Sequence, residues 1–164
     1  IPVIARINGD AFGGGTGLAL AADWRVMATH ARLGFVFARV GLAGADAGVT
    51  YFLPRLVGPA RALEILLKGK VFNADAALQA DLVYDVVAPE ELDRATDELA
   101  RQLASGPPIG TRFTKEGVIE SLNRSLDAEF DFESRAQTTC LVSADHKEGV
   151  KAFLEKRTPR FEGR

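Results

Sequence analysis

Three consecutive glycines, Gly13, Gly14 and Gly15, are the residues whose type and spacing point most clearly to chemistry. They follow a short apolar run at residues 3–7, predicted to be a strand, and precede a run of small apolar residues, 18–22, predicted to be a buried helix. A helix N-terminus presents unpaired backbone N–H groups, and glycines let an anionic oxygen approach them closely. The pattern therefore suits phosphate binding, oxyanion stabilisation, or a tight turn that packs a helix on a sheet.

The spacing of the glycines argues against the two common phosphate motifs. The dinucleotide-binding fingerprint has glycines at its first, third and sixth positions, and the phosphate loop ends in Gly-Lys-Ser/Thr. Here the three glycines are contiguous, and Thr16-Gly17-Leu18 follows them. An oxyanion cradle and a packing turn both remain open from these residues alone.

The elements that must hold the turn alternate between strand and helix as far as Val87, and only helices are predicted after it. The fold class is therefore α/β, with a core at residues 1–88 that carries the turn and a helical region at 89–164. Further strands are predicted at 24–28, 33–37 and 82–87, and helices at 49–57, 59–68, 73–80 (Asn73 as its N-cap), 89–104, 109–122, 125–141 and 143–155.

The stretch from Ile1 to Asp23 resembles the central signature of the crotonase family, the enoyl-CoA hydratases and isomerases. The resemblance continues through Leu53–Gly58, Ala60–Gly69, Ala80–Val83 and Phe153–Phe161. It implies a spiral of strand-strand-helix turns followed by helices that build a trimer, often paired into a hexamer. It also implies coenzyme A thioester substrates, with coenzyme A entering as part of the substrate and no separate cofactor.

The resemblance further implies that the N–H of Gly14 points at the thioester oxygen, with Gly13 also at the substrate. An enolate-like oxyanion would be stabilised there by fixed N–H donors. The family's upstream portion, which carries the second donor and much of the coenzyme A contact, is absent from the sequence.

The sequence departs from the hydratase pattern at both catalytic glutamates. By spacing, one falls on Gly17 and the other near Phe37, and neither residue can transfer a proton. The carboxylate that remains in this region is Asp46, in the glycine-rich loop 41–48. It resembles the proton-transferring carboxylate of dienoyl-CoA isomerases and the nucleophile of 4-chlorobenzoyl-CoA dehalogenases. The alternative is that Asp46 caps the following helix.

Four further residues are candidates for substrate contact. Phe35 and Phe37 alternate on a predicted strand and could line an acyl pocket, or simply pack in the core. Phe153 and Lys156 resemble family positions that cover the acyl chain and reach the coenzyme A phosphates. Their i, i+3 spacing predicts that they share one helix face, which could instead pack on the body of the protein.

The amino-acid composition limits the partners, metal sites and cellular location that we expect. The 164 residues carry a net charge of −2, with one cysteine and two histidines, so nucleic acid and a His/Cys metal site are not expected. No apolar run is long enough for a membrane span, and the single cysteine fits a reducing, cytoplasmic location. Because the sequence opens inside a predicted core strand, we expect a fragment, or a chain whose upstream half was lost or lies elsewhere.

Two hypotheses follow for function. The first is an acyl-CoA-processing enzyme that passes through a thioester enolate, an isomerase or a relative rather than a typical hydratase, with Asp46 as the base. The second is a non-catalytic acyl-CoA-binding or assembly subunit, or an inactive fragment. Apolar stripes in the helices after Pro108 predict a subunit interface, and with the family resemblance they lead us to expect a homotrimer or hexamer.

Overall fold

The computed structural model describes residues 1–164 as two compact units. The first, which we call the core unit, is Val3–Leu99. The second, the helical unit, is Ala100–Arg164 together with Ile1–Pro2. The core unit ends at Leu99 rather than at residue 88 because Leu92 and Leu99 on the following helix pack against its apolar centre.

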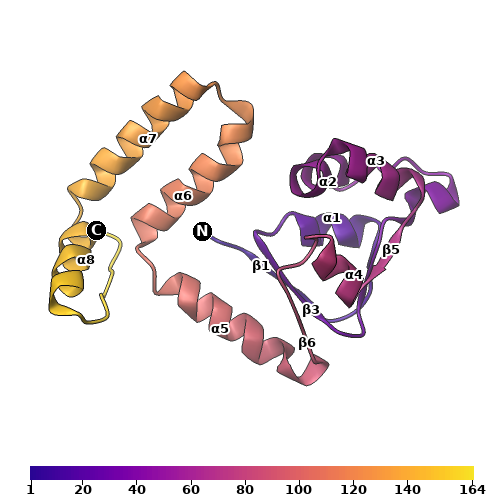
Figure 1. Ribbon diagram of the computed structural model, residues 1–164, viewed down its shortest axis with the longest axis horizontal. Coiled ribbons are helices and arrows are strands. Elements are labelled where there is room, and N and C mark those ends of the chain that lie inside the picture. Colours follow the sequence, from indigo (N-terminus) through magenta and orange to yellow (C-terminus); the bar gives the residue numbers. More distant parts are fainter. The chain divides into compact units, whose positions relative to one another are not determined.

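Two three-stranded sheets form the frame of the core unit (Figure 1). In one, β1 (Ile4–Ile7), β3 (Trp24–Ala28) and β6 (Asp85–Val87) run parallel, with β3 in the middle. Val26, Met27 and Ala28 of β3 are fully or almost fully buried, as expected for the centre of a parallel sheet. In the other sheet β4 lies in the middle, parallel to β2 and antiparallel to β5: β2 (Ala11–Phe12), β4 (Arg32–Gly34), β5 (Val71–Asn73).

Helices surround these sheets and complete the core. Their bounds are α1 (Gly14–Leu20), α2 (Val49–Val57), α3 (Pro59–Leu67), α4 (Ala74–Gln79) and α5 (Leu92–Ala104), with short 3-10 helices at Val36–Val40 and Pro89–Glu91. Asn73 caps α4, since its side chain accepts a hydrogen bond from the Ala76 N–H at 2.9 Å. Leu33, Phe35, Leu53, Ile65 and Leu82 are completely buried.

The helical unit contains α6 (Pro108–Glu120), α7 (Leu126–Leu141) and α8 (Ala144–Glu155), with a 3-10 turn at Ser121–Asn123. Figure 1 shows α6 and α7 as a helical hairpin. The hydroxyl groups of Ser125 and Ser143 cap α7 and α8. Few apolar side chains are buried here: Phe132, Ala136 and Ala152.

The C-terminal tail of the helical unit folds back on the start of α8. The buried carboxylate of Asp145 accepts hydrogen bonds from the N–H groups of Glu162 (2.7 Å) and Gly163 (2.9 Å). The Arg164 carbonyl accepts one from Ala144 at 2.7 Å. The polar tail is therefore tied down although it has no regular structure.

The α/β class and the all-helical second half agree with the sequence-based prediction, while several bounds differ. The strand predicted at 33–37 is wrong beyond Gly34, because the chain turns into the 3-10 helix Val36–Val40 and closes it with Gly41 at φ 73°. The first helix begins at Gly14 instead of Leu18. The last strand covers only Asp85–Val87. No helix combines the length and the hydropathy that a membrane crossing would need.

Candidate active site

The glycine turn joins β2 to α1 and is fixed by backbone hydrogen bonds. Gly13, at φ 56° and ψ −121°, is the N-cap of α1, and its own N–H donates to the Gly34 carbonyl at 3.0 Å. The Gly13 carbonyl accepts from Thr16 and Gly17 at 3.0 and 3.3 Å. The N–H groups of Gly14 and Gly15 find no acceptor within the chain, so they remain available to a ligand.

Side chains hold this turn against the second sheet. The buried Thr16 hydroxyl lies 2.7 Å from the Ala11 carbonyl and 3.1 Å from that of Gly34. The ring of Phe37 packs on the turn, with its Cε1 atom 3.7 Å from the position that a Cβ atom on Gly13 would occupy. Phe37 therefore contacts the glycine turn, but its side chain is buried in the apolar core and comes from a 3-10 helix instead of a strand.

Phe35 has a different place. Its side chain is completely buried and meets the ring of Phe72 edge to face, with the ring centroids 6.1 Å apart. It leaves no surface for a ligand, so the core-packing alternative describes Phe35 here.

Asp46 lies beside the glycine turn. Its carboxylate oxygen Oδ2 is 3.5 Å from the position of a Cβ atom on Gly14. The side chain is exposed and makes no hydrogen bond or ion pair. The capping alternative for Asp46 is wrong: the N-cap of α2 is Gly48, without a side-chain cap, and Asp46 contributes only its carbonyl, which accepts from the Val49 N–H at 2.9 Å.

The loop that carries Asp46 takes an unusual backbone conformation. Ala47 at φ 45° and Gly48 at φ 77° are both left-handed, and for a non-glycine residue this conformation costs roughly 1–2 kcal/mol. The loop also approaches α1 very closely, since a Cβ atom on Gly17 would lie 2.5 Å from the Ala47 carbonyl oxygen and 2.8 Å from the Ala47 Cβ. Sequence reasoning treated Gly17 only as the position of a missing glutamate and did not find this contact.

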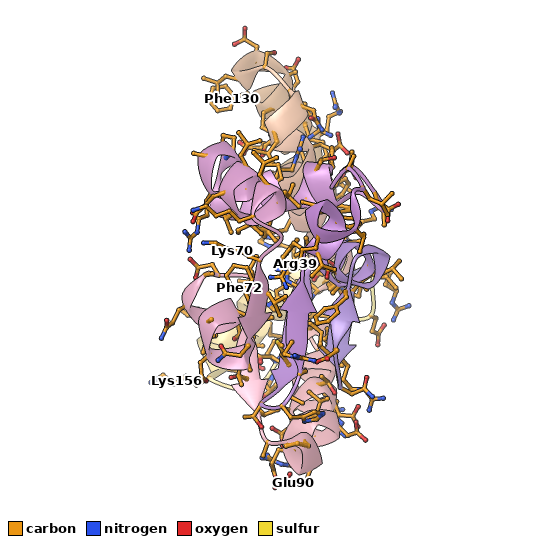
Figure 2. The ribbon with its side chains drawn as sticks, turned by 90° about the vertical axis from the view of Figure 1, so that its right-hand side faces the viewer. Arg39, Lys70, Phe72, Glu90, Phe130 and Lys156 are labelled. Atoms are coloured by element: carbon orange, nitrogen blue, oxygen red, sulfur yellow. The ribbon has the colours of Figure 1, made fainter.

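Two of the predicted contact residues belong to the helical unit. Phe153 is 82% exposed and lines an apolar groove of about 400 Å³ with Ile109, Cys140, Val150 and Phe161. Lys156 is exposed (Figure 2) and ends α8 in a left-handed conformation, at φ 54° and ψ 41°. The prediction that Phe153 and Lys156 share a helix face is therefore wrong, because the helix stops before Lys156.

Arg39 belongs to the same 3-10 helix as Phe37. It packs on Gly69, beside Lys70 (Figure 2), and a Cβ atom on Gly69 would lie 2.9 Å from the Arg39 Cγ. Lys70 forms an ion pair with Glu64 at 2.6 Å, and Arg61 and Lys68 contact the same carboxylate. Hydrogen bonds from Lys70 first, and from Arg61 next, lower the pKa of Glu64 to about 2.

Comparison with known proteins gives a consistent family. The 1,2-epoxyphenylacetyl-CoA isomerase of Escherichia coli (strain K12) is 38% identical over 163 residues, which are 99% of this chain and 62% of that protein. The crotonyl-CoA hydratase of Syntrophomonas wolfei is 39% identical over 160 residues, 98% of this chain and 61% of that protein. The chain thus spans a little over three fifths of the length of these relatives.

Solved structures agree with the fold. The crystal structure of an enoyl-CoA hydratase from Bacillus anthracis superposes with a TM-score of 0.94 at 39% identity, covering 99% of this chain and 63% of that one. This likeness confirms the crotonase-like α/β class. The enoyl-CoA hydratase/isomerase family model matches residues 1–164 throughout. The chain therefore belongs to the enoyl-CoA hydratase/isomerase family.

Proposed function

We propose that this chain is part of an enzyme that moves a proton on an acyl-CoA thioester through an enolate, with Gly14 and Asp46 as its catalytic groups. The observation that carries the proposal is the position of the Asp46 carboxylate beside Gly14, whose N–H is unpaired. A base and an oxyanion donor next to each other are what such a reaction requires.

The proposed reaction conserves atoms. Asp46 takes a proton from a carbon conjugated with or next to the thioester carbonyl, and the electron pair moves onto the carbonyl oxygen. The Gly14 N–H stabilises the resulting negative charge. The protonated Asp46 then returns the proton at another carbon of the same conjugated system, so a double bond shifts and nothing is gained or lost.

Hydration is less well supported, because water addition needs a carboxylate to activate water as well as a proton donor. Gly17 and Phe37 supply neither. The relatives include proteins named as hydratases and as an isomerase, so the family is compatible with both reactions. The isomerase reading is the one that a single carboxylate favours.

The remaining contacts in the proposal follow from position. Gly13 and the edge of the Phe37 ring, which is 5% exposed and packs in the apolar core, border the thioester at the turn, while the fully buried Phe35 only supports the core. Phe153 and Lys156 are proposed, from the family resemblance, as contacts for the acyl chain and a coenzyme A phosphate. Coenzyme A enters with the substrate and no separate cofactor is invoked. The exposed apolar faces of the helical unit favour self-association, and the homotrimer or hexamer in the proposal comes from the family resemblance.

The experiment is solvent deuterium exchange into an enoyl-CoA thioester, followed by NMR, with the protein at its full natural length. Asp46→Asn should slow exchange by about 10²–10⁴-fold, because general-base catalysis is lost. Asp81→Asn is the matched control: Asp81 is an exposed loop residue at φ 56°, a conformation that asparagine tolerates. Exchange that survives in Asp46→Asn at the wild-type rate would refute the proposal.

A second function, acyl-CoA binding without turnover, is favoured by the absence of a carboxylate at residues 17 and 37. It predicts calorimetric binding of acyl-CoA with no exchange in the wild-type protein. In both cases Gly14→Val should weaken thioester binding or turnover, since a side chain at Gly14 would come within 3.5 Å of the Asp46 carboxylate and obstruct the approach to the N–H. Removal of one oxyanion donor typically lowers the rate by about 10²–10³-fold.

A further inference from the structure

The closest approach between the Asp46 loop and the glycine helix is at Gly17. This residue is buried in α1, one turn after Gly14. A Cβ atom there would lie 2.5 Å from the Ala47 carbonyl oxygen and 3.1 Å from its carbonyl carbon. Both are backbone atoms, so they cannot turn away as the end of a flexible side chain could. Any residue other than glycine at position 17 must therefore displace the loop or the helix.

The same loop segment fixes Asp46. Ala47 touches Gly17 from one side, and its Cβ lies 3.8 Å from the position of a Cβ atom on Gly14. The preceding residue is Asp46, whose Oδ2 faces Gly14. The left-handed conformation of Ala47 and Gly48 turns the chain from Asp46 into α2. A strained backbone conformation persists only where its surroundings hold it, and here the surroundings are α1.

We propose that Gly17 is a positioning residue: its missing side chain seats the loop 44–48 on α1 and thereby places the Asp46 carboxylate beside Gly14. The consequence for the reaction rests on the function proposed above, whereas the structural part does not. The absence of a side chain at Gly17 then determines the position of the Asp46 carboxylate. A side chain at position 17 and Asp46 in its present place exclude each other.

The structural arm of the test compares crystal structures of the protein and of Gly17→Ala. The Asp46 carboxylate should move away from Gly14 by about 1 Å or more, because the added Cβ would otherwise overlap the Ala47 carbonyl. Gly9→Ala is the matched control, since a Cβ atom on Gly9 meets nothing within 4 Å. An Asp46 carboxylate that keeps its place in Gly17→Ala overturns the proposal whatever the activity.

The kinetic arm measures deuterium exchange into an enoyl-CoA thioester. Gly17→Ala should lower the rate constant by about 10²-fold, the effect of a displacement near 1 Å, with KM little changed because the Gly14 N–H is retained. If Gly17 acts through Asp46, adding Gly17→Ala to Asp46→Asn should cause no further loss. A further loss of similar size in that double variant would show a general structural defect and overturn the positioning role.

A second variant covers the case in which Gly17→Ala does not fold. Ala47→Leu enlarges the side chain that faces α1 from an exposed loop, so the core is untouched. It should reproduce the loss of rate and the displacement of Asp46. The failures are distinguishable: wild-type exchange in Asp46→Asn refutes the proposed function, whereas a loss in Asp46→Asn together with wild-type behaviour in both Gly17→Ala and Ala47→Leu refutes only the role of Gly17.

Discussion

The core unit and the helical unit differ in how much of their apolar surface is buried within the chain. The main apolar cluster draws all its members from the core unit, and side chains such as Met27, Leu33 and Leu53 have no exposed surface. In the helical unit Phe130, Leu141 and Phe153 are more than half exposed, and Figure 2 shows Phe130 at the molecular surface. The core unit therefore carries its own stabilisation, whereas the helical unit presents apolar faces that another surface has to cover.

The difference between the units also divides the residues of the proposed site into two groups. Gly14, Gly17 and Asp46 lie together in the core unit, where packing fixes their geometry. Phe153 and Lys156 lie in the helical unit, where packing within the chain is sparse. We expect substitutions in the first group to act on the reaction, and substitutions in the second group to act on assembly and substrate affinity.

The strongest test of this difference is the same substitution, phenylalanine to alanine, made once in each unit. Phe35→Ala removes a fully buried ring and should lower the free energy of unfolding by about 3–5 kcal/mol. Phe153→Ala removes a ring that is 82% exposed and should change it by less than about 0.5 kcal/mol in dilute monomer, while weakening self-association. Urea unfolding and sedimentation velocity measure the two effects. Equal losses of stability would mean that the helical unit has a core of its own.

Removing a helix N-cap in each unit tests the same difference with a smaller expected effect on stability. Asn73→Ala removes the cap of α4 and should lower the free energy of unfolding by about 1 kcal/mol, whereas Asn8→Ala, at an exposed residue that caps no helix, should not. Ser143→Ala removes the cap of α8, where the Ser143 hydroxyl accepts from the His146 N–H at 3.0 Å. Its effect should appear as faster amide exchange confined to α8. A matching fall in global stability would contradict the separation of the units.

The smallest expected effect is a dependence on pH. The pKa of Glu64 in the core unit and that of Glu148 in the helical unit are both lowered to about 2, the second mainly by Arg157. A lowered carboxylate pKa stabilises the fold above the unfolded value near 4.5, and this contribution disappears as the pH falls toward 2. Glu64→Gln should therefore lower the melting temperature slightly at pH 7, and the difference should shrink below pH 4.5. A constant difference down to pH 3 would argue against the ion pairs.

The sequence predicted the regular elements of both units well where local signals are strong. The strand Trp24–Ala28 and the helix Val49–Val57 have the predicted bounds, and Pro54 does not break the latter. The start of α1 was missed because glycines have the lowest helix propensity apart from proline, and here sheet contacts through Thr16 override it.

The sequence identified candidate residues of the site but could not predict which of them contact one another. The alternation of Phe35 and Phe37 imitates a strand, but the left-handed Gly41 closes a 3-10 helix there instead. The contact between Gly17 and Ala47 joins residues thirty positions apart through backbone atoms, and no local pattern encodes it. The predicted helix at 18–22 excluded Gly17, so the sequence contained no signal for the contact; only in α1 (Gly14–Leu20) does a mid-helix glycine point to a packing reason.

The contact between Gly17 and Ala47 also governs the order in which mutations can accumulate. A glutamate at position 17, where hydratases of the family are expected to have one, would meet the Ala47 carbonyl before it could reach a substrate. The loop would have to move first, and that change alone would displace Asp46 from its place beside Gly14 and so remove the proposed site. In this chain, a second carboxylate at position 17 therefore has to be preceded by a change in the loop, and a scan of single substitutions would score Gly17→Glu as harmful even if that substitution is compatible with a remodelled loop.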